Sequence, residues 1–331
     1  MPYKAIVLLS GGLDSILAAR LMKELGFEVD CVHYHIDFAA CAGGAAGAEK
    51  AAKDIGVPLK IFDITKEYLG ILKKPAHGYG ANVNPCIDCK IFMLKKAKEY
   101  MEKTGGAFLV TGEVLGERPM SQRKDALNLI EKNAGVRGIL LRPLSAKLLA
   151  PTIPEKEGIV DRDKLLDIRG RSRKPQMSLA EKFGIKEYPN PSGGCLLTDP
   201  GFAKRVKDLF KHNAVDVDNL LLLKEGRHYR ISDGAKLVVG RDENENMALQ
   251  KIAIPGDVYL KLKYKQGPVS LLRGKVDDDI IKHAAGIAAY HTKFRHEPSL
   301  EVDYWRRGSN IRTTVSVKPA SQTEVEKIRI Q

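Results

Sequence analysis

Short apolar runs alternate with amphipathic segments in the first part of the chain. Residues 4–9 (Lys-Ala-Ile-Val-Leu-Leu) have the pattern of a strand buried on both faces, and apolar positions recur at helical spacing from Ser15 to Leu25. The same criteria predict a helix at 45–55 and strands at 29–36, 59–63, 107–111 and 138–141. Strands that alternate with helices predict an α/β fold with a doubly wound parallel sheet, in which ligands bind beyond the carboxyl ends of the strands.

The pattern changes after about residue 215. Short strand-like segments broken by turns fill residues 226–272, an alanine-rich helix is predicted at 278–290, and residues 302–317 return to strand character. These features predict a second, smaller α+β domain. We therefore expect two domains, at 1–215 and 222–331.

Composition narrows the class of protein. The chain has 331 residues, 44% of them hydrophobic, and no apolar stretch approaches the roughly 18 residues that a membrane span needs. The first residues run directly into a strand without a signal-peptide pattern, so we expect a cytoplasmic protein with no membrane partner. Five cysteines do not suggest a secreted disulfide framework. The formal charge of +13 favours a polyanionic partner.

The first predicted strand leads into Ser10-Gly11-Gly12-Leu13-Asp14-Ser15 and then into a helix. Gly11 and Gly12 allow the backbone to approach an anion closely, and the amides that begin the helix favour negative charge. Ser10 and Ser15 add hydroxyl donors. Asp14 would repel a phosphate unless a cation lay between them, so we assign it to Mg²⁺.

Three cysteines form a second candidate site. Cys86 and Cys89 make a Cys-x-x-Cys pair before a predicted helix, and Cys195 follows two glycines about a hundred residues later. Three thiolates would leave one corner of a cubane iron–sulfur cluster open for a reactive sulfide. Zinc with a fourth ligand, persulfide and disulfide chemistry without a cluster, and packing alone are the alternatives. For Cys31 and Cys41 we expect small buried side chains.

The Ser-Gly-Gly-Leu-Asp-Ser loop resembles that of the PP-loop ATP pyrophosphatases, which have an adenine nucleotide alpha hydrolase-like fold. The resemblance implies cleavage of ATP between its α and β phosphates. Such enzymes adenylate a carbonyl oxygen, and a nucleophile then displaces AMP.

Residues 1–210 are similar, more specifically, to the PP-loop enzymes that thiolate tRNA uridines. Thr111-Gly112-Glu113-Val114-Leu115-Gly116, the later Ser121-Gln122 and the Arg-Pro-Leu at 142–144 look like segments of 4-thiouridine synthases. The resemblance implies a [4Fe-4S] cluster on Cys86, Cys89 and Cys195. We place Gly112 in the nucleotide site and assign Glu113 and Gln122 to substrate or nucleotide positioning.

Two parts common in 4-thiouridine synthases have no counterpart in this sequence. The RNA-binding THUMP region and the rhodanese extension are both missing. The absence of the rhodanese favours the cluster route for sulfur. The absence of the THUMP region requires another part of the chain to hold RNA.

Most of residues 222–320 resembles the NFACT-R domain, through Ser232-Asp233-Gly234 and a Gly-Arg-x-x-x-x-Asn motif that ends at Asn246. The alternative to an RNA-binding role is a purely structural one, a small α+β module that packs on the enzyme domain. Lysines and arginines neutralise phosphates, and aromatic rings stack on bases. The RNA-binding candidates are Arg169, Arg171, Arg173, Lys174, Arg306 and Arg307.

These features together predict a tRNA sulfurtransferase that uses ATP and Mg²⁺. ATP would adenylate O4 or O2 of a uridine, and sulfide would displace AMP. The partners would be tRNA and a sulfur donor, either sulfide or a protein that carries a persulfide. The alternatives are a PP-loop amidotransferase or small-molecule synthetase, and a non-catalytic RNA- or ribosome-binding factor.

Overall fold

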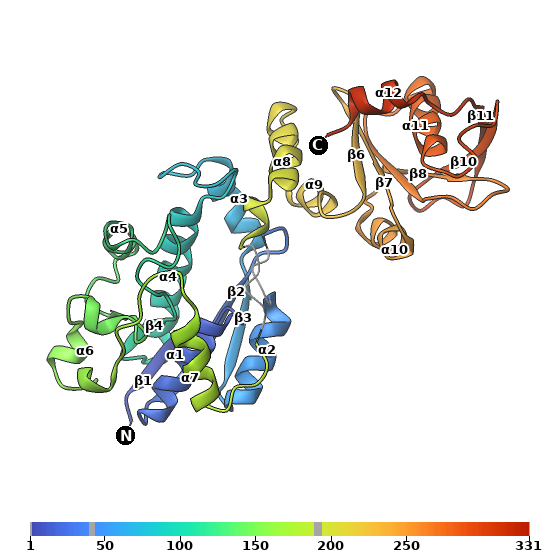
Figure 1. Ribbon diagram of the computed structural model, residues 1–331. Helices are drawn as coiled ribbons and strands as arrows, with labels where there is room; N and C mark the ends of the chain where they lie inside the picture. The colour runs from blue at the N-terminus through green and yellow to red at the C-terminus, as the bar shows by residue number, and fades with distance from the viewer. Residues whose placement is uncertain (1, 40–43, 189–193, 331) are drawn as a thin grey trace. The chain divides into compact units, whose positions relative to one another are not determined.

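The computed structural model describes residues 2–39, 44–188 and 194–330 of the chain (Figure 1). The chain divides into two compact units, Met1–Thr198 and Asp199–Gln331. Cys41 lies outside the described residues. In the part of the chain that is described, no helix is both long and apolar enough to cross a membrane.

The first unit is built on a five-stranded sheet in the order β3-β2-β1-β4-β5, and every neighbouring pair is parallel. The strands are β1 (Lys4–Leu8), β2 (Glu28–His35), β3 (Leu59–Asp63), β4 (Phe108–Thr111) and β5 (Leu140–Leu141). The helices are α1 (Leu13–Glu24), α2 (Gly44–Ile55), α3 (Thr65–Lys73), α4 (Cys86–Thr104), α5 (Lys124–Ala134), α6 (Ile153–Lys156) and α7 (Lys174–Lys182). Single 3-10 turns lie at Ala146–Leu148, Arg162–Lys164 and Leu196–Thr198.

Helices cover both faces of this sheet, because β1 is apolar on both sides. Ala5 and Val7 are fully buried in one core together with residues of α1 and α2. Ile6, which points to the opposite face, lies near Met101 of α4. The structure therefore confirms the predicted doubly wound parallel sheet.

The sheet order places the two glycine-containing loops side by side. The chain moves from β1 to β2 on one side and returns to β4 on the other, so β1 and β4 are neighbours at the point where the order reverses. Leu8 at the end of β1 lies opposite Thr111 at the end of β4. The segments that follow both strands therefore begin at the edge where α/β sheets bind ligands.

The second unit is an antiparallel sheet with helices, as predicted. Its strand order is β11-β10-β8-β9-β7-β6. The strands are β6 (Arg227–Ser232), β7 (Ala235–Val239), β8 (Val258–Leu262), β9 (Ser270–Gly274), β10 (Leu300–Arg306) and β11 (Thr313–Val317). The helices are α8 (Pro200–Lys211), α9 (Val217–Leu222), α10 (Glu243–Ile252), α11 (Asp278–Tyr290) and α12 (Gln322–Ile328).

Alternate side chains of the strands divide this sheet into two faces. Leu237 and Val239 of β7 belong to the core that contains the buried alanines of α11. Val238, between them, packs with Leu249 of α10 and Leu222 of α9. The small alanine side chains let α11 lie close to the sheet over the whole helix.

Candidate functional site

The loop between β1 and α1 is held against α2 by a glycine. Gly11 has a positive φ of 80°, and a Cβ at this position would lie 2.8 Å from the backbone nitrogen of Ala48. Gly12 follows as the residue that caps α1. An alanine at position 11 would therefore suffer both backbone strain and a clash with helix backbone.

The two serines of the loop bind each other. The Ser15 hydroxyl donates to the carbonyl oxygen of Gly12 (2.8 Å) and accepts from the Ser10 amide (3.1 Å). The Ser10 and Ser15 hydroxyl oxygens are 3.1 Å apart. Ser15 is buried and Ser10 is exposed. The loop is thus shaped in advance by its own hydrogen bonds, with the Ser10 hydroxyl accessible to a ligand.

Gly112 packs tightly on this loop from β4. A Cβ on Gly112 would lie 2.3 Å from the carbonyl carbon and oxygen of Asp14 and 2.5 Å from the amide nitrogen of Ser15. Such distances are not tolerated without backbone movement. Gly112 therefore allows the two segments to touch, and the assignment of this residue to nucleotide contact remains a prediction.

The Asp14 carboxyl group lies in a polar cluster. Burial raises its pKa, although Arg173, Gln176 and Arg118 act in the opposite direction. Burial also raises the pKa of Glu117, and the adjacent Asp14 carboxyl raises it further. Two carboxyl groups so close together repel each other when both are ionised.

Several buried atoms of this cluster make no hydrogen bond of good geometry among the described residues, although Asp14 interacts with both Gln176 and Glu117. They are Oδ1 of Asp14, Oε2 of Glu117, Nε of Arg173, and both polar side-chain atoms of Gln176. Gln176 is fully buried. Buried polar groups normally have partners, so a cluster with this many free atoms is suited to a polar ligand. Paired carboxylate oxygens fit Mg²⁺, which is commonly held by one or two carboxylates together with substrate phosphates.

The Glu113 carboxylate forms ion pairs with two cations of the first unit. Its carboxylate lies 2.5 Å from Nζ of Lys90 and 2.9 Å from Nε of Arg142, and it accepts a hydrogen bond from the Thr111 hydroxyl (3.2 Å). Burial alone would raise its pKa, but the two cations lower it to about 2. Arg142 also pairs with Glu131 of α5. Glu113 therefore joins β4 to α4 and to the segment after β5.

Gln122 stabilises the loop that follows β4. Its side-chain oxygen accepts a hydrogen bond from the Arg118 amide (2.9 Å), and its carbonyl oxygen accepts one from the Gly116 amide (2.7 Å). The side chain is buried. These bonds fix the loop that carries Glu117.

Cys86 and Cys89 lie in the first turn of α4, whereas the sequence pattern placed them before the helix. The segment that contains Cys195 is hydrogen-bonded to the residues that lead into α4. The amide of Val83 donates to the carbonyl oxygen of Leu197 (3.3 Å), and the Asn82 side chain donates to that of Thr198 (2.7 Å). The short turn after Cys195 is thereby fastened to the segment that enters α4.

The hydroxyl group of Tyr68 interacts electrostatically with all three thiols. Tyr68 belongs to α3 and is 1% exposed. Burial raises its pKa, as do electrostatic interactions with Cys89, Cys195 and Cys86 and a side-chain hydrogen bond with Cys89. The structure therefore brings together the three cysteines that the sequence singled out. Tyr68 itself gave no signal, because a tyrosine on an amphipathic helix has the pattern of a core residue.

The donor atoms and the arrangement of the three cysteines give different indications about a metal. Three thiols suit an iron–sulfur cluster chemically. Among the described residues, however, no group of three or more His, Cys, Asp or Glu side chains is arranged to hold a metal ion. The side chains as placed do not form a ligand set. Cys31 is fully buried in β2, and burial raises its pKa to about 12.

Two contacts connect the thiols with the serine-glycine loop. Lys90 follows Cys89 directly and pairs with Glu113, and Gly112, which precedes Glu113, packs on Asp14. The Cys195 thiol contacts the carbonyl oxygen of Ala39 (3.6 Å), beyond the carboxyl end of β2. Both groups of residues therefore lie at the same edge of the sheet.

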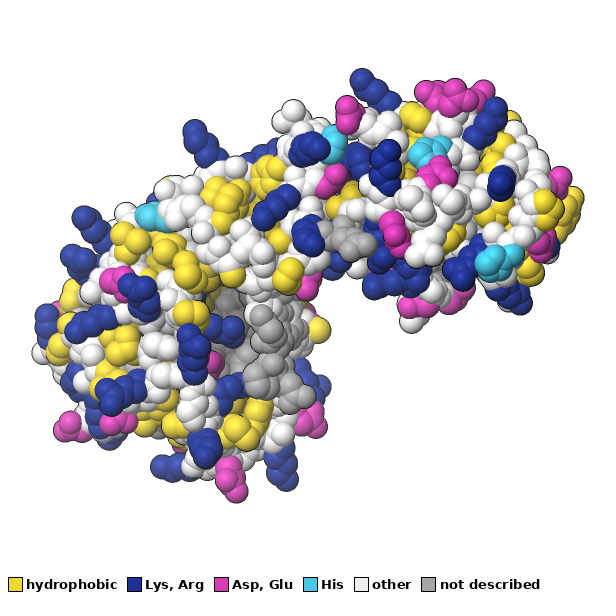
Figure 2. Space-filling model, turned by 45° about the horizontal axis from the view of Figure 1, so that its top comes forward, with side chains coloured by type: hydrophobic (Ala, Val, Ile, Leu, Met, Phe, Trp, Pro, Cys, Tyr) yellow, Lys and Arg dark blue, Asp and Glu magenta, His cyan; other side chains and the backbone are white. Residues whose placement is uncertain are grey.

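The basic candidates have different environments. In the first unit, Arg169, Arg171 and Lys174 are exposed, whereas Arg173 is half-buried beside Asp14. In the second unit, Arg306 and Arg307 are exposed and donate to backbone carbonyl groups of Gly256 and Ala253. Figure 2 shows lysine and arginine side chains spread over both units in that view, with acidic side chains among them.

Two family models match separate parts of the chain. Residues 2–149 match the model described as Thiamine biosynthesis protein (ThiI), and residues 226–329 match the NFACT protein RNA binding domain. The first match covers β1, the serine-glycine loop, the Cys-x-x-Cys pair and the segment after β4.

Curated relatives are similar over part of their length. A probable tRNA sulfurtransferase of Clostridium perfringens is 29% identical over 170 residues, which are 49% of this chain and 40% of the relative. The tRNA-specific 2-thiouridylase MnmA of Nitratiruptor sp. is 29% identical over 118 residues, with 34% and 35% covered. The chain thus spans two fifths or less of these relatives.

Among solved structures, a 4-thiouridine synthetase–RNA complex with bound ATP is 23% identical. The match covers 57% of this chain and 44% of that chain, with a TM-score of 0.37. The two ranges matched by family models lie in different structural units of the chain. Residues 2–149 are thus similar to the ThiI model, and residues 226–329 are similar to the NFACT protein RNA binding domain.

Proposed function

We propose that this protein is an ATP-dependent tRNA sulfurtransferase that replaces a uridine carbonyl oxygen with sulfur. The observation that carries the proposal is the position of three thiols and a PP-loop at one sheet edge. Tyr68 interacts electrostatically with Cys86, Cys89 and Cys195, and Lys90 and Gly112 connect that group with Asp14. Activation of a carbonyl group and delivery of sulfur must reach the same uridine, and two sites at one sheet edge meet this requirement.

The first half-reaction activates the uridine. The carbonyl oxygen attacks the α-phosphorus of ATP, an oxygen–phosphorus bond forms, and the bond to the β-phosphate oxygen breaks to release pyrophosphate. The Ser10 hydroxyl and the amides that begin α1 bind phosphate oxygens. Arg173 and Gln176 have free donors beside Asp14, and these donors support a role in holding the phosphates.

Mg²⁺ would be held by Asp14 and Glu117, where it neutralises charge on the phosphate groups. Their two unpartnered carboxylate oxygens support this assignment. Glu117 would also restrict access to Asp14 from solvent. We therefore add Glu117 to the residues proposed from the sequence.

The second half-reaction transfers sulfur. A sulfide nucleophile attacks the activated carbon, a carbon–sulfur bond forms, and the carbon–oxygen bond breaks with AMP as the leaving group. AMP is a much better leaving group than hydroxide, which is why activation by ATP is required. With sulfide as the donor, a cluster on Cys86, Cys89 and Cys195 would hold it, and no change of oxidation state is needed. With a persulfide-carrying donor, we propose that one of the three thiols takes the outer sulfur and releases the donor thiol. This new persulfide attacks the activated carbon as AMP leaves, a second thiol of the three then forms a disulfide that frees the thiouridine, and a dithiol reductant restores both thiols. The [4Fe-4S] cluster is a prediction that iron content tests.

The specific alternative is a PP-loop enzyme that uses ammonia. Amide chemistry has no use for three gathered thiols, so the arrangement around Tyr68 favours sulfur. The similarity of residues 226–329 to an RNA binding domain favours a tRNA substrate.

The proposal is tested with protein purified without oxygen and incubated with unmodified tRNA, ATP, Mg²⁺ and sulfide. We expect AMP and pyrophosphate in equal amounts, and thiouridine in the nucleosides of the digested tRNA by mass spectrometry. The position and atom of the thiolated uridine are read from the same digest. ATP cleavage that is stimulated by ammonia and a small acid, with no thiouridine formed, would establish the alternative.

A further inference from the structure

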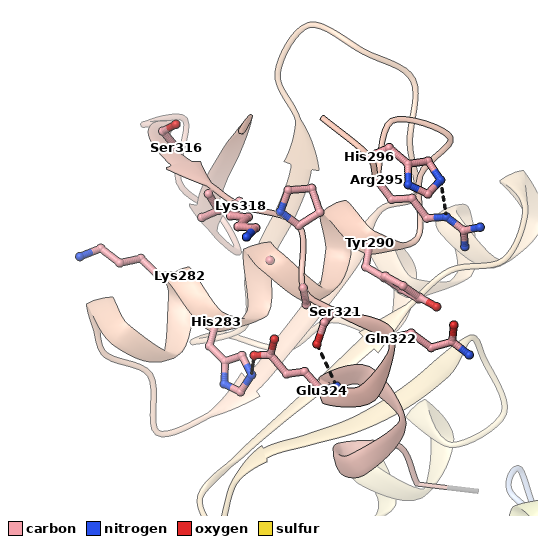
Figure 3. A pocket seen from close by; sticks show the side chains of 14 residues that line it. Lys282, His283, Tyr290, Arg295, His296, Ser316, Lys318, Ser321, Gln322 and Glu324 are labelled. Carbon is pink, nitrogen blue, oxygen red and sulfur yellow. Dashed lines mark hydrogen bonds and ion pairs between the residues drawn. The ribbon is translucent and has the colours of Figure 1, made fainter. Parts of the chain in front are cut away.

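The second unit contains a pocket of about 820 Å³ that the proposed chemistry does not use. It lies between α11, the end of β11, the start of α12 and the segment that follows α11 (Figure 3). Pockets for small ligands commonly enclose roughly 300–1,000 Å³. The space is therefore large enough for a nucleotide.

A glycine in α11 shapes one wall of this pocket. A Cβ at Gly286 would lie 3.2 Å from the carbonyl oxygen of Lys318, and the amide of Ala320 donates to the carbonyl oxygen of Gly286 (3.0 Å). The segment between β11 and α12 thus packs directly on α11. This contact brings Lys318 to the same pocket as Lys282.

The cations of the pocket have no acidic partners. Elsewhere in the unit, Lys265 pairs with Glu297 and Arg273 with Asp257. Within the described part of the chain, Lys282, Arg295 and Lys318 make no ion pair, and all three are exposed.

The carboxylates of Asp277, Asp278 and Asp279 begin α11 about one turn before Lys282, but they do not line the pocket. Glu324 is the one acidic side chain among the described residues that line the pocket, and it lies 3.1 Å from Nε2 of His283. Three unpaired cations around one cavity create a positive field that attracts an anionic ligand.

The other end of the pocket presents rings and a guanidinium group. Tyr290 lies two turns along α11 from Lys282, about 12 Å at 1.5 Å per residue. The Arg295 guanidinium lies 5.6 Å from the centre of the Tyr290 ring, and its Nε donates to the His296 ring (3.4 Å). Figure 3 shows these residues together, away from Lys282. Aromatic rings and guanidinium planes are the groups on which unpaired bases stack.

We infer that this pocket binds an unpaired segment of RNA, one or two nucleotides long, with Tyr290 and Arg295 against a base and Lys282 and Lys318 against phosphates. The inference rests on the proposed function, because it gives the tRNA substrate a place on the second unit. It explains why cations and a ring share one cavity. An acidic peptide would use the cations and would have no need of the ring.

The test measures binding of the full chain to a fluorescent hexauridylate over a range of salt concentrations. In the variant Lys282→Ala/Lys318→Ala, the slope of log affinity against log salt should fall by about 1.4, since each phosphate contact on a single strand contributes about 0.7. The matched control is Lys204→Ala/Lys251→Ala, which removes the same charge from exposed lysines of the same unit outside the pocket. Its slope should remain that of the wild type. Equal losses in both variants would overturn the inference.

The ring is tested separately. Tyr290→Leu should weaken hexauridylate binding roughly 5- to 160-fold, the range for one lost base stack, whereas Tyr290→Phe should bind as the wild type does. Polyglutamate that displaces the RNA equally well from the wild type and from Tyr290→Leu would show a general anion site and overturn the inference.

The binding test of the pocket and the thiolation test of the proposed function can fail independently of each other. If the wild type makes thiouridine but the pocket variants bind hexauridylate unchanged, the pocket assignment is wrong and the function stands. If no thiouridine forms but the pocket variants lose RNA specifically, the function is wrong and the pocket stands.

Discussion

Gly112 lies directly against the backbone of Asp14, so closely that a Cβ on Gly112 would be 2.3 Å from the Asp14 carbonyl. The segment after β4 and the loop after β1 are therefore in contact without any side chain between them. Gly112→Ala must move one of these segments. We expect a loss of about 1–3 kcal/mol in stability, typical of overpacking, together with weakened ATP binding.

Thermal unfolding and ATP titration calorimetry check this prediction. The matched control is Gly70→Ala in α3, where a Cβ would meet nothing within 4 Å. Alanine is favoured over glycine inside helices by about 0.5–1 kcal/mol, so this variant should be as stable as the wild type or more stable. A Gly112→Ala protein with normal ATP affinity would refute the packing role.

Glu117 and Asp14 supply the second prediction, which concerns the metal. Glu117→Gln removes one carboxylate charge with little change of shape, so the Mg²⁺ concentration for half-maximal pyrophosphate release should rise at least tenfold, roughly 1.4 kcal/mol. Asp14→Ala should abolish turnover and leave the fold intact. Asp125→Asn, at an exposed ion pair with Arg123, is the control and should leave the Mg²⁺ dependence unchanged. Wild-type Mg²⁺ dependence in Glu117→Gln would remove this residue from the site.

Lys236 of β7 supplies the third prediction, a pH dependence of stability. Burial lowers its pKa from 10.5 to about 7, and Arg230, Arg205 and Arg273 contribute in the same direction, whereas Asp208 opposes them. In the unfolded chain the lysine stays protonated up to its ordinary pKa, about 10.4. Between about pH 7 and 10 the unfolded state therefore binds more protons, and this group makes stability rise with pH.

Lys236→Met should thus stabilise the protein most at pH 7 and below, and its advantage should shrink as the pH rises toward 10. Denaturant unfolding of the full chain from pH 6 to 9.5, followed on the second unit, measures the difference. Lys251→Met changes an exposed lysine and should leave the pH profile unchanged. A constant difference between Lys236→Met and the wild type at every pH would contradict the assignment.

Local pattern was sufficient to predict the sheet of the first unit. The apolar run of β1, the two glycines after it and the strand at 59–63 all appear where the sequence indicated, since burial on both faces leaves a continuous apolar signal. The short strand-like segments broken by turns at 226–272 likewise predicted the α+β unit. The helices α8 and α9, which belong to the second unit, were not among the predicted elements.

Long-range contacts could not be predicted in the same way. Arg173 follows other basic residues in sequence, yet its Nε is buried near Asp14, because α7 packs on α1. Glu117 lies in a segment that the sequence singled out, but its approach to Asp14 depends on the contact at Gly112. Tyr68 lies among the thiols only because three separate segments meet in space.

The cysteines provide the last prediction, because they separate activation from sulfur transfer. Cys86→Ala, Cys89→Ala and Cys195→Ala should each lose thiolation of tRNA while they still release pyrophosphate, since the PP-loop is untouched. Cys31→Ala is the control: this thiol is fully buried in β2, and its loss should leave thiolation intact.

Iron and sulfide analysis of protein reconstituted without oxygen then identifies the chemistry. With a [4Fe-4S] cluster, the three variants lose iron, colour and thiolation together, because three ligands are the minimum for a cubane with one open iron. Zinc gives a colourless protein with bound metal. Full thiolation by an iron-free wild type would exclude the cluster. If this activity requires a persulfide donor and a dithiol reductant, persulfide chemistry remains, with Cys195 as the leading carrier, whereas activity with sulfide alone shows direct attack by sulfide. If all three variants thiolate normally, sulfur transfer does not pass through these thiols, and the role proposed for them is wrong although the protein is a sulfurtransferase.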